Sequence, residues 1–99
     1  MARCAVQAVW TMAGTASDPH ARDDELRDRI APGVAALPGF VQGVWARSVD
    51  GTRSHNMIVF ENRDGADALV AHIEQNKPYS AAAGVHLHSL EMMDVVVSA

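Results

Sequence analysis

An Asp-Gly pair between two stretches of alternating polarity constrains the fold of this chain more than any other feature. Residues 40–48 and 54–61 carry the alternating, β-branched and aromatic pattern of strands, and the turn "VDGT" joins them with Asp50-Gly51 at its centre. Asp-Gly favours the tight turn between antiparallel neighbours because both residues tolerate a positive φ. We therefore expect a β-hairpin, so the sheet of this protein contains at least one antiparallel pair.

Further strands and helices are expected on either side of the hairpin. Residues 3–12 alternate between two faces and predict a first strand, and residues 85–97 predict the last one. A helix is expected from Pro19, since Ser17 or Asp18 can cap it and proline suits the first helical position.

The first helix carries a single apolar stripe that would face a core. Its members are spaced by three or four residues: Leu26, Ile30, Val34 and Leu37. Pro32-Gly33 lies inside this stripe and predicts a kink or a break near Ala31, because a proline ring clashes with the carbonyl four residues earlier. Pro38-Gly39 ends the helix.

A second helix is predicted for residues 62–76, with Asn62 or Asp64 as its cap and Pro78 beyond its end. The loop 77–84 is expected to follow it and holds the single tyrosine of the chain. Such a loop could cover a cavity as a lid, and a packing anchor is the alternative interpretation of the tyrosine.

The resulting order, β-α-β-β-α-β, predicts an α+β fold of the ferredoxin-like type in one domain, residues 1–99. Two helices would cover one face of a four-stranded antiparallel sheet. The other face still carries Val, Met and Trp at alternating positions, and no segment of the chain is left to cover it. A second copy could do so, and we therefore expect a homodimer.

Composition excludes several classes of function. The formal net charge is -4 and Lys and Arg form no run, which argues against a nucleic-acid partner. One cysteine allows no internal disulfide, and no apolar run approaches the roughly 20 residues of a membrane span. The N-terminal stretch loosely resembles a signal peptide, but Gln7 and Thr11 interrupt its apolar run. We expect a cytoplasmic protein with no membrane partner.

Three stretches carry a family resemblance: "VQAVW" in the first strand, "ALPGFVQGVW" before and within the second, and "NMIVFENRDGADAL" leading into the second helix. With these, the chain resembles the dimeric α/β-barrel superfamily of the antibiotic-biosynthesis-monooxygenase type. The resemblance implies two sheets packed face to face into a barrel, with an interior cavity on each protomer. Members include cofactor-independent monooxygenases, haem-degrading enzymes and isomerising enzymes, so the fold alone does not choose a function.

The haem-degrading branch implies an Asn in the first strand, with a Trp and an iron-binding His in or beside the second helix. Gln7 stands at the first position here, and Leu69 or His72 stands at the second. No His follows where the branch has one, because the stretch "KPYSAAAG" occupies that place. We therefore expect no haem and no other cofactor.

A His-x-His pair followed by a carboxylate, in His86, His88 and Glu91, raises the question of a metal site. In a regular strand the two histidines share a face, while Glu91 points to the opposite one unless a bulge intervenes. The three side chains then cannot converge on one ion. The sequence favours a half-buried barrel strand and no metal.

The candidate site has two catalytic residues, His55 and His88, and four substrate-binding residues, Gln7, Trp45, Asn56 and His86. A histidine beside a bound phenol is a plausible general base, since its reference pKa lies near neutral pH. A cofactor-free oxygenase must mainly deprotonate its substrate into an anion that reacts with oxygen. The amides would hydrogen-bond this anion and the indole would stack on its ring. The structural alternative is a solvated His55, a Gln7 bonded to backbone, and a Trp45 in the dimer core.

Two functions follow from this set. The first is a cofactor-independent monooxygenase acting on a small aromatic or polyketide-like compound. The second is a non-catalytic ligand-binding or stress-associated barrel, which the absence of any motif specific to a known active site favours. Cavity size discriminates between them, since an enclosed space below about 300 Å³ is too small for a typical ligand.

Overall fold

The computed structural model describes residues 3–12 and 19–99. Its elements are β1 Cys4–Thr11, α1 Pro19–Glu25, the π-helical segment η1 Leu26–Ile30, α2 Ala31–Ala35, β2 Phe40–Arg47, β3 Arg53–Phe60, α3 Arg63–Ala82 and β4 His86–Asp94. The strands form one antiparallel sheet in the order β2-β3-β1-β4. This arrangement confirms the predicted ferredoxin-like fold.

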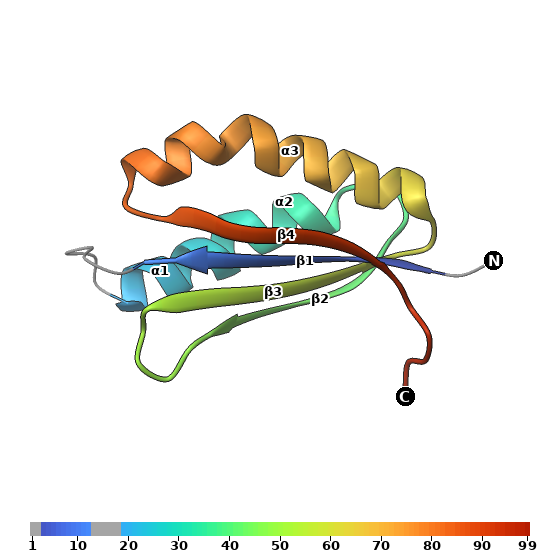
Figure 1. The fold of residues 1–99 in the computed structure, drawn as a ribbon, viewed down its shortest axis with the longest axis horizontal. Helices are drawn as coiled ribbons and strands as arrows, with labels where there is room; N and C mark the ends of the chain where they lie inside the picture. The colour runs from blue at the N-terminus through green and yellow to red at the C-terminus, as the bar shows by residue number, and fades with distance from the viewer. Residues whose placement is uncertain (1–2, 13–18) are drawn as a thin grey trace.

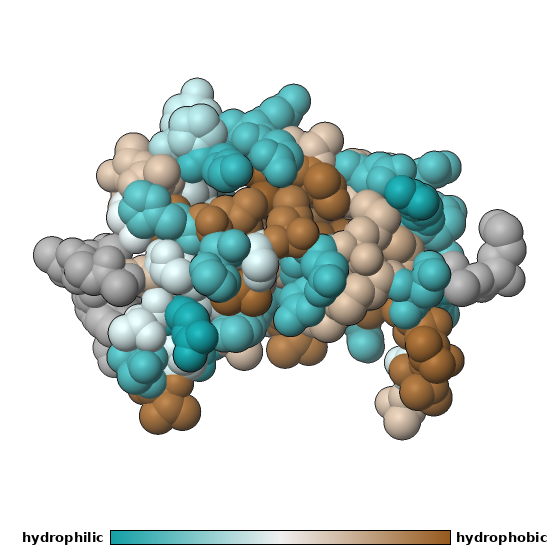
Figure 2. All heavy atoms as spheres, in the orientation of Figure 1, coloured by the Kyte–Doolittle hydropathy of each residue, from teal (hydrophilic) through white to brown (hydrophobic). Residues whose placement is uncertain are grey.

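The helices lie on one side of the sheet. Figure 1 shows α3 running along the top of the view and the α1–η1–α2 stretch passing behind β4 and β1, with the hairpin turn and the C-terminal residues extending below. In the part of the chain that is described, no helix covers the other face. Figure 2 shows hydrophobic residues gathered along the seam between α3 and β4. The sheet therefore has one covered face and one open face.

The predicted hairpin is present. Gly51 has a φ of 76°, the left-handed conformation that glycine adopts without strain, and its N–H donates to the carbonyl of Ser48 at 2.9 Å. The carboxylate of Asp50 accepts from the Ser48 hydroxyl and from both the N–H and the hydroxyl of Thr52, at 2.7 to 3.0 Å. Side-chain hydrogen bonds of this kind favour the turn over an extended chain.

The first helical stretch passes its proline without a break. The sequence predicted a kink or a break near Ala31. The helical stretch is continuous there, a π turn precedes Pro32, and the N–H of Ala31 donates to the carbonyl of Leu26, five residues earlier. Proline lacks an N–H and crowds the preceding turn, and the wider π turn accommodates it. The predicted caps Ser17 and Asp18 lie outside the described residues.

The second helix is longer than predicted. Asn62 is its N-cap as expected, since its side chain accepts from the N–H of Asp64 at 3.0 Å. The predicted end near Pro78 and the predicted loop 77–84 are wrong, because α3 continues through Pro78 to Ala82. Pro78 removes one helical hydrogen bond, but the alanine-rich stretch behind it has high helix propensity.

The core lies between the helices and the covered face of the sheet. Its largest cluster of buried residues draws on β1, β3, α2 and α3: Cys4, Val6, Val34, Ile58, Phe60, Ala66 and Leu69. Val6 pairs with Ile58 and Cys4 with Phe60, so alternate residues of β1 and β3 supply the sheet side of this cluster. A second cluster contains Trp10 and Val85 and lies toward the other end of the sheet.

The open face carries the opposite set of side chains. Val44 pairs with Met57, which pairs with Gln7, and Gln7 pairs with Glu91 on β4, so these four form a row across the open face. Val44 is 59% exposed and Met57 is 38% exposed. Two large apolar side chains of this row are therefore left exposed by the described part of the chain.

No helix in the described part of the chain is both long and apolar enough to cross a lipid bilayer.

Candidate functional site

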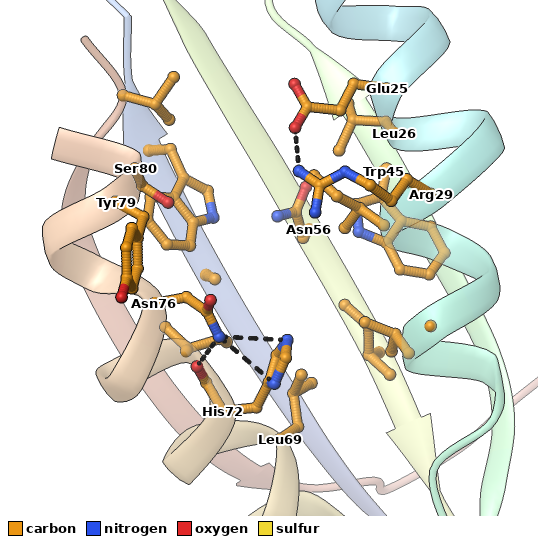
Figure 3. Close-up of a pocket in the computed structure, with 18 of the residues that line it drawn as sticks. Glu25, Leu26, Arg29, Trp45, Asn56, Leu69, His72, Asn76, Tyr79 and Ser80 are labelled. Atoms are coloured by element: carbon orange, nitrogen blue, oxygen red, sulfur yellow. Dashed lines mark hydrogen bonds and ion pairs between the residues drawn. The ribbon is translucent and has the colours of Figure 1, made fainter. Parts of the chain in front are cut away.

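A cavity of about 520 Å³ lies between the covered face of the sheet and the helices. Figure 3 shows that strand β3 runs along its floor, with the α1–η1 stretch on one side and α3 on the other. Most of the lining is apolar, from Val6 and Ile58 on the floor to Ile30, Leu69 and Ile73 on the helices. This volume lies above the limit of about 300 Å³ and within the range of ligand pockets.

The indole of Trp45 forms part of the cavity wall because Gly43 leaves room for it. Both residues lie on the same face of β2, two positions apart. A Cβ atom at position 43 would lie 2.7 Å from Cη2 and Cζ3 of Trp45, closer than carbon atoms approach in proteins. The glycine therefore allows the ring to lie along its own strand.

Asn56 holds the second tryptophan of the cavity. In the orientation of the Asn56 amide that gives both its oxygen and its nitrogen a hydrogen-bond partner, Oδ1 accepts from Nε1 of Trp10 at 3.1 Å. Its Nδ2 donates to the carbonyl of His55 at 3.1 Å and to the hydroxyl of Ser54 at 3.2 Å. Asn56 is buried (8% exposed), and its hydrogen-bonded amide fixes the position of Trp10 in the wall.

The α1–η1 side of the cavity presents three charged residues one helical turn apart. Nη2 of Arg29 donates to Oε1 of Glu25, and Nη1 of Arg22 lies 3.5 Å from Oε2 of the same carboxylate. The hydrogen bond from Arg29 lowers the pKa of Glu25, against a smaller opposing effect of burial. Glu25 is therefore a carboxylate at neutral pH, held between two guanidinium groups.

An ion pair ties this helical stretch to the edge of the sheet. Nε and Nη2 of Arg47 on β2 donate to the two carboxylate oxygens of Asp23 on α1, each at 3.1 Å. The hydrogen bond raises the pKa of Arg47. Two parallel hydrogen bonds fix direction as well as distance, so this pair helps to hold α1 beside Trp45.

The α3 side presents polar side chains at helical spacing. His72, Asn76, Tyr79 and Ser80 line the cavity, and Figure 3 shows them along one side of it. Nδ2 of Asn76 donates to the backbone carbonyl of His72 at 2.8 Å and lies 3.4 Å from both ring nitrogens of His72. Tyr79 lies on the helix, 76% exposed, and not on a lid loop.

The predicted site residues separate into two groups. Trp45 and Asn56 line the cavity. Gln7 and His55 lie on the open face, because each alternates with a residue that faces the helices. His86 pairs with Thr11 and shares that open face.

The bulge in β4 explains why His88 joins neither group. Ser89 pairs with Val9 and Leu87 pairs with Trp10, so His88 is the extra residue between two paired ones. The bulge also brings Glu91 to the face of His86, but several residues along the sheet separate them. Within residues 3–12 and 19–99, no three His, Cys, Asp or Glu side chains gather closely enough to hold a metal ion.

The sequence did not single out the charged residues of α1 and η1. A signal was present, since Arg22, Glu25 and Arg29 recur at spacings of three and four beside the apolar stripe of Leu26 and Ile30. Such a pattern is also the ordinary solvent-exposed face of a helix. Only the position of the stretch over the sheet places these side chains at a cavity.

No family model and no curated protein matches the sequence. Solved structures do match. A variant of SnoaB, a cofactor-independent oxygenase from Streptomyces nogalater, aligns with a TM-score of 0.69 at 18% identity, covering 97% of this chain and 95% of that one. A monooxygenase from Streptomyces coelicolor in complex with nanaomycin D aligns with a TM-score of 0.64 at 16% identity, covering 99% and 90%.

A dimeric ferredoxin-like protein from an uncultured marine organism aligns over 100% of both chains, with a TM-score of 0.69 at 10% identity. Identities this low extend the likeness to the fold alone. The chain therefore has the ferredoxin-like fold found in these oxygenases, as its resemblance to the antibiotic-biosynthesis-monooxygenase type implied.

Proposed function

We propose that this protein binds a small planar aromatic compound, of polyketide-like character, in the cavity and oxidises it with molecular oxygen without a cofactor. The observation that supports this most directly is the cavity itself. Its volume of about 520 Å³ suits a compound of two or three fused rings, and two indoles form parts of its wall. The structural neighbours described as oxygenases support the same class of reaction.

The reaction needs a base and oxygen. Removal of a proton from an activated ring carbon gives a delocalised anion, which passes an electron to oxygen; the resulting radicals join into a peroxide. Loss of water from this peroxide leaves a carbonyl, so that CH₂ and O₂ become C=O and H₂O. The substrate carbon is oxidised and oxygen is reduced, and no further reductant is required.

His72 is the residue that we propose as the base. Among the described residues that line the cavity, His72 is the only histidine. Its ring nitrogens lie 3.4 Å from Nδ2 of Asn76, which can orient the ring. The two histidines predicted from the sequence, His55 and His88, do not line this cavity. Geometry therefore favours His72 as the base.

Oxygen consumption with 1,8-dihydroxyanthrone tests this proposal. We expect one O₂ consumed for each anthraquinone formed, at a rate well above the uncatalysed oxidation. His72→Ala should lower kcat by about 100-fold or more, the usual contribution of a general base. His55→Ala is the matched control, because His55 is exposed on the opposite face. Equal losses in both variants, or no rate above background, would contradict the proposal.

The second candidate is a non-catalytic barrel that binds the same class of compound. One observation favours it. The amide of Asn56 is already hydrogen-bonded to Trp10, Ser54 and a backbone carbonyl, which leaves it little capacity to bind a substrate anion. The same assay separates the two functions. Binding that quenches tryptophan fluorescence, with no oxygen uptake, would identify the non-catalytic protein.

We also propose that the protein is a homodimer. The open face of the sheet supports this, since Val44 and Met57 lie exposed in its central rows, and one structural neighbour that matches along its whole length is described as dimeric. Packing of two open faces would bury these side chains and enclose the two sheets in a barrel.

A further inference from the structure

The cavity lining has the opposite charge sign to the protein. The whole chain has a formal net charge of -4. The charged residues that line the cavity are Arg22, Arg29 and Glu25, two cations and one anion, which leaves an excess of one positive charge. A positive site inside an otherwise acidic protein favours an anionic ligand over a neutral one.

Arg22 lines this wall and carries a buried hydrogen-bond donor that no acceptor in the described part of the chain meets. Its side chain is 18% exposed, and its Nη1 lies 3.5 Å from Glu25. Its Nε is buried and has no hydrogen-bond partner among the described residues. A buried donor on a charged group destabilises a protein unless an acceptor meets it, so an unpartnered one indicates a missing acceptor.

The neighbouring charges of the described residues leave that donor without an acceptor. Glu25 is already held by Arg29, and its lowered pKa keeps it charged, so it occupies the terminal nitrogen of Arg22 and leaves Nε free. Nε and a terminal nitrogen of a guanidinium form a planar fork that matches the oxygens of an anion. Apolar side chains, among them Leu26 and Ile30, line the same cavity, so the acceptor would be attached to an apolar ring system.

We infer that Arg22 binds an anionic oxygen of the ligand, and hence that the protein takes aromatic compounds bearing an acidic hydroxyl or a carboxylate. This inference rests on the proposed binding of an aromatic compound in the cavity. It adds a specificity-determining residue on α1, whose role is to select and orient the anion at one end of the cavity.

Paired probes measure this selection. 2-Naphthoate and its neutral methyl ester differ in a carboxylate, and 2-hydroxy-1,4-naphthoquinone and its 2-methoxy analogue differ in an acidic hydroxyl. Quenching of tryptophan fluorescence reports on binding, because the two tryptophans of the chain, Trp10 and Trp45, both line the cavity. Wild-type protein should bind at least one anion more tightly than its neutral partner.

Arg22→Gln should weaken binding of that anion by about 10- to 100-fold, the usual effect of losing one charge-assisted hydrogen bond. Its effect on the neutral partner should stay within about threefold, and Arg22→Lys should restore part of the preference. Arg27→Gln is the matched control from η1, because Arg27 pairs with Asp24 and does not line this cavity. Thermal unfolding of each variant verifies that it is folded.

The outcomes are distinct. Weaker binding of the anion alone in Arg22→Gln supports the inference. The probe pair in which the preference for the anion disappears then identifies the ligand oxygen as that of a carboxylate or of an acidic hydroxyl. Equal anion preference in wild type and Arg22→Gln overturns the inference but leaves aromatic binding intact. No binding of any of the four probes to the wild type overturns the proposed function itself.

Discussion

Trp45 lies along its own strand because residue 43 has no side chain, and this single contact shapes one wall of the cavity. The sequence does not predict this contact, since a glycine at position 43 only interrupts the strand pattern. A glycine inside a strand often marks a place where another group approaches closely, and here that group is an indole two residues along the chain.

We predict that Gly43→Ala displaces the Trp45 ring and destabilises the protein by about 1–3 kcal/mol, as overpacking does. Urea unfolding gives the free energy, and the tryptophan emission spectrum reports the movement of the ring. In a Trp45→Val background the same substitution should have little effect, because the clashing ring is gone. A penalty that persists in that background would show that the contact with Trp45 is not its cause.

Asp50 makes the hairpin turn sensitive to pH. Hydrogen bonds from Thr52 and Ser48 lower its pKa to about 2, below the ordinary value of 3.8. Because the pKa is lower in the folded state than in the unfolded chain, Asp50 contributes stability above about pH 4. That contribution is lost as the pH falls from about 4 through 2.

Asp50→Asn should therefore be less stable than the wild type at pH 7 and should approach it below about pH 2, because protonated Asp and Asn are both neutral. Urea unfolding at pH 7, at pH 4 and below about pH 2 measures the difference. A constant gap between Asp50→Asn and the wild type at all three pH values would refute the prediction.

At the scale of elements, two departures from a regular helix decide what lines the cavity. The π turn Leu26–Ile30 carries the first helix past Pro32, and α3 continues through Pro78 and brings Tyr79 and Ser80 to the cavity. The sequence marks both prolines as places where a helix ends. Local rules overestimate such breaks, because residues after a proline can continue the helix when their propensity and packing favour it.

The start of α3 approaches β3 very closely, and this predicts opposite effects for two helical glycines. A Cβ at Gly65 would lie 2.5 Å from the Phe60 ring and from the carbonyl oxygen of Pro38, whereas a Cβ at Gly33 would have nothing within 4 Å. Gly65→Ala should destabilise by about 1–3 kcal/mol, since the backbone carbonyl cannot move aside.

Gly33→Ala is the matched control and should stabilise by about 0.5–1 kcal/mol, the usual advantage of alanine inside a helix. Thermal or urea unfolding of both variants tests the pair. If both substitutions changed the free energy of unfolding in the same direction, the close approach of α3 to β3 would not be the determining contact.

At the scale of the whole molecule, the open face of the sheet predicts the state of association. Val44→Lys should convert the proposed dimer to a folded monomer, because a charge opposite Met57 would have to be buried in the interface. Val49→Lys is the matched control, since Val49 is fully exposed in the hairpin turn and off the sheet face.

Sedimentation equilibrium gives the mass, and circular dichroism verifies that each variant is folded. A wild-type protein that sediments as a monomer, or a Val44→Lys variant with the wild-type mass, would argue against a dimer built through this face.

Part of the candidate site could be predicted from the sequence. Trp45 and Asn56 were recognised as chemistry-bearing residues on strands, and both line the cavity. Gln7 and His55 were equally conspicuous but lie on the opposite face, because side chains of a strand alternate and residue types alone do not say which face looks inward. His88 lies at a bulge, which one strand cannot reveal without its partner.

The sequence by itself determined the order of elements, the hairpin at Asp50-Gly51, the start of the second helix at Asn62 or Asp64, and the alternation that builds the core. These follow from local rules of propensity, turn chemistry and periodicity, which act within a few residues. Tertiary structure alone decided which sheet face is covered, where β4 bulges, and that Arg22 and His72 face one cavity. Those features depend on contacts between segments distant in the chain, and no local pattern contains them.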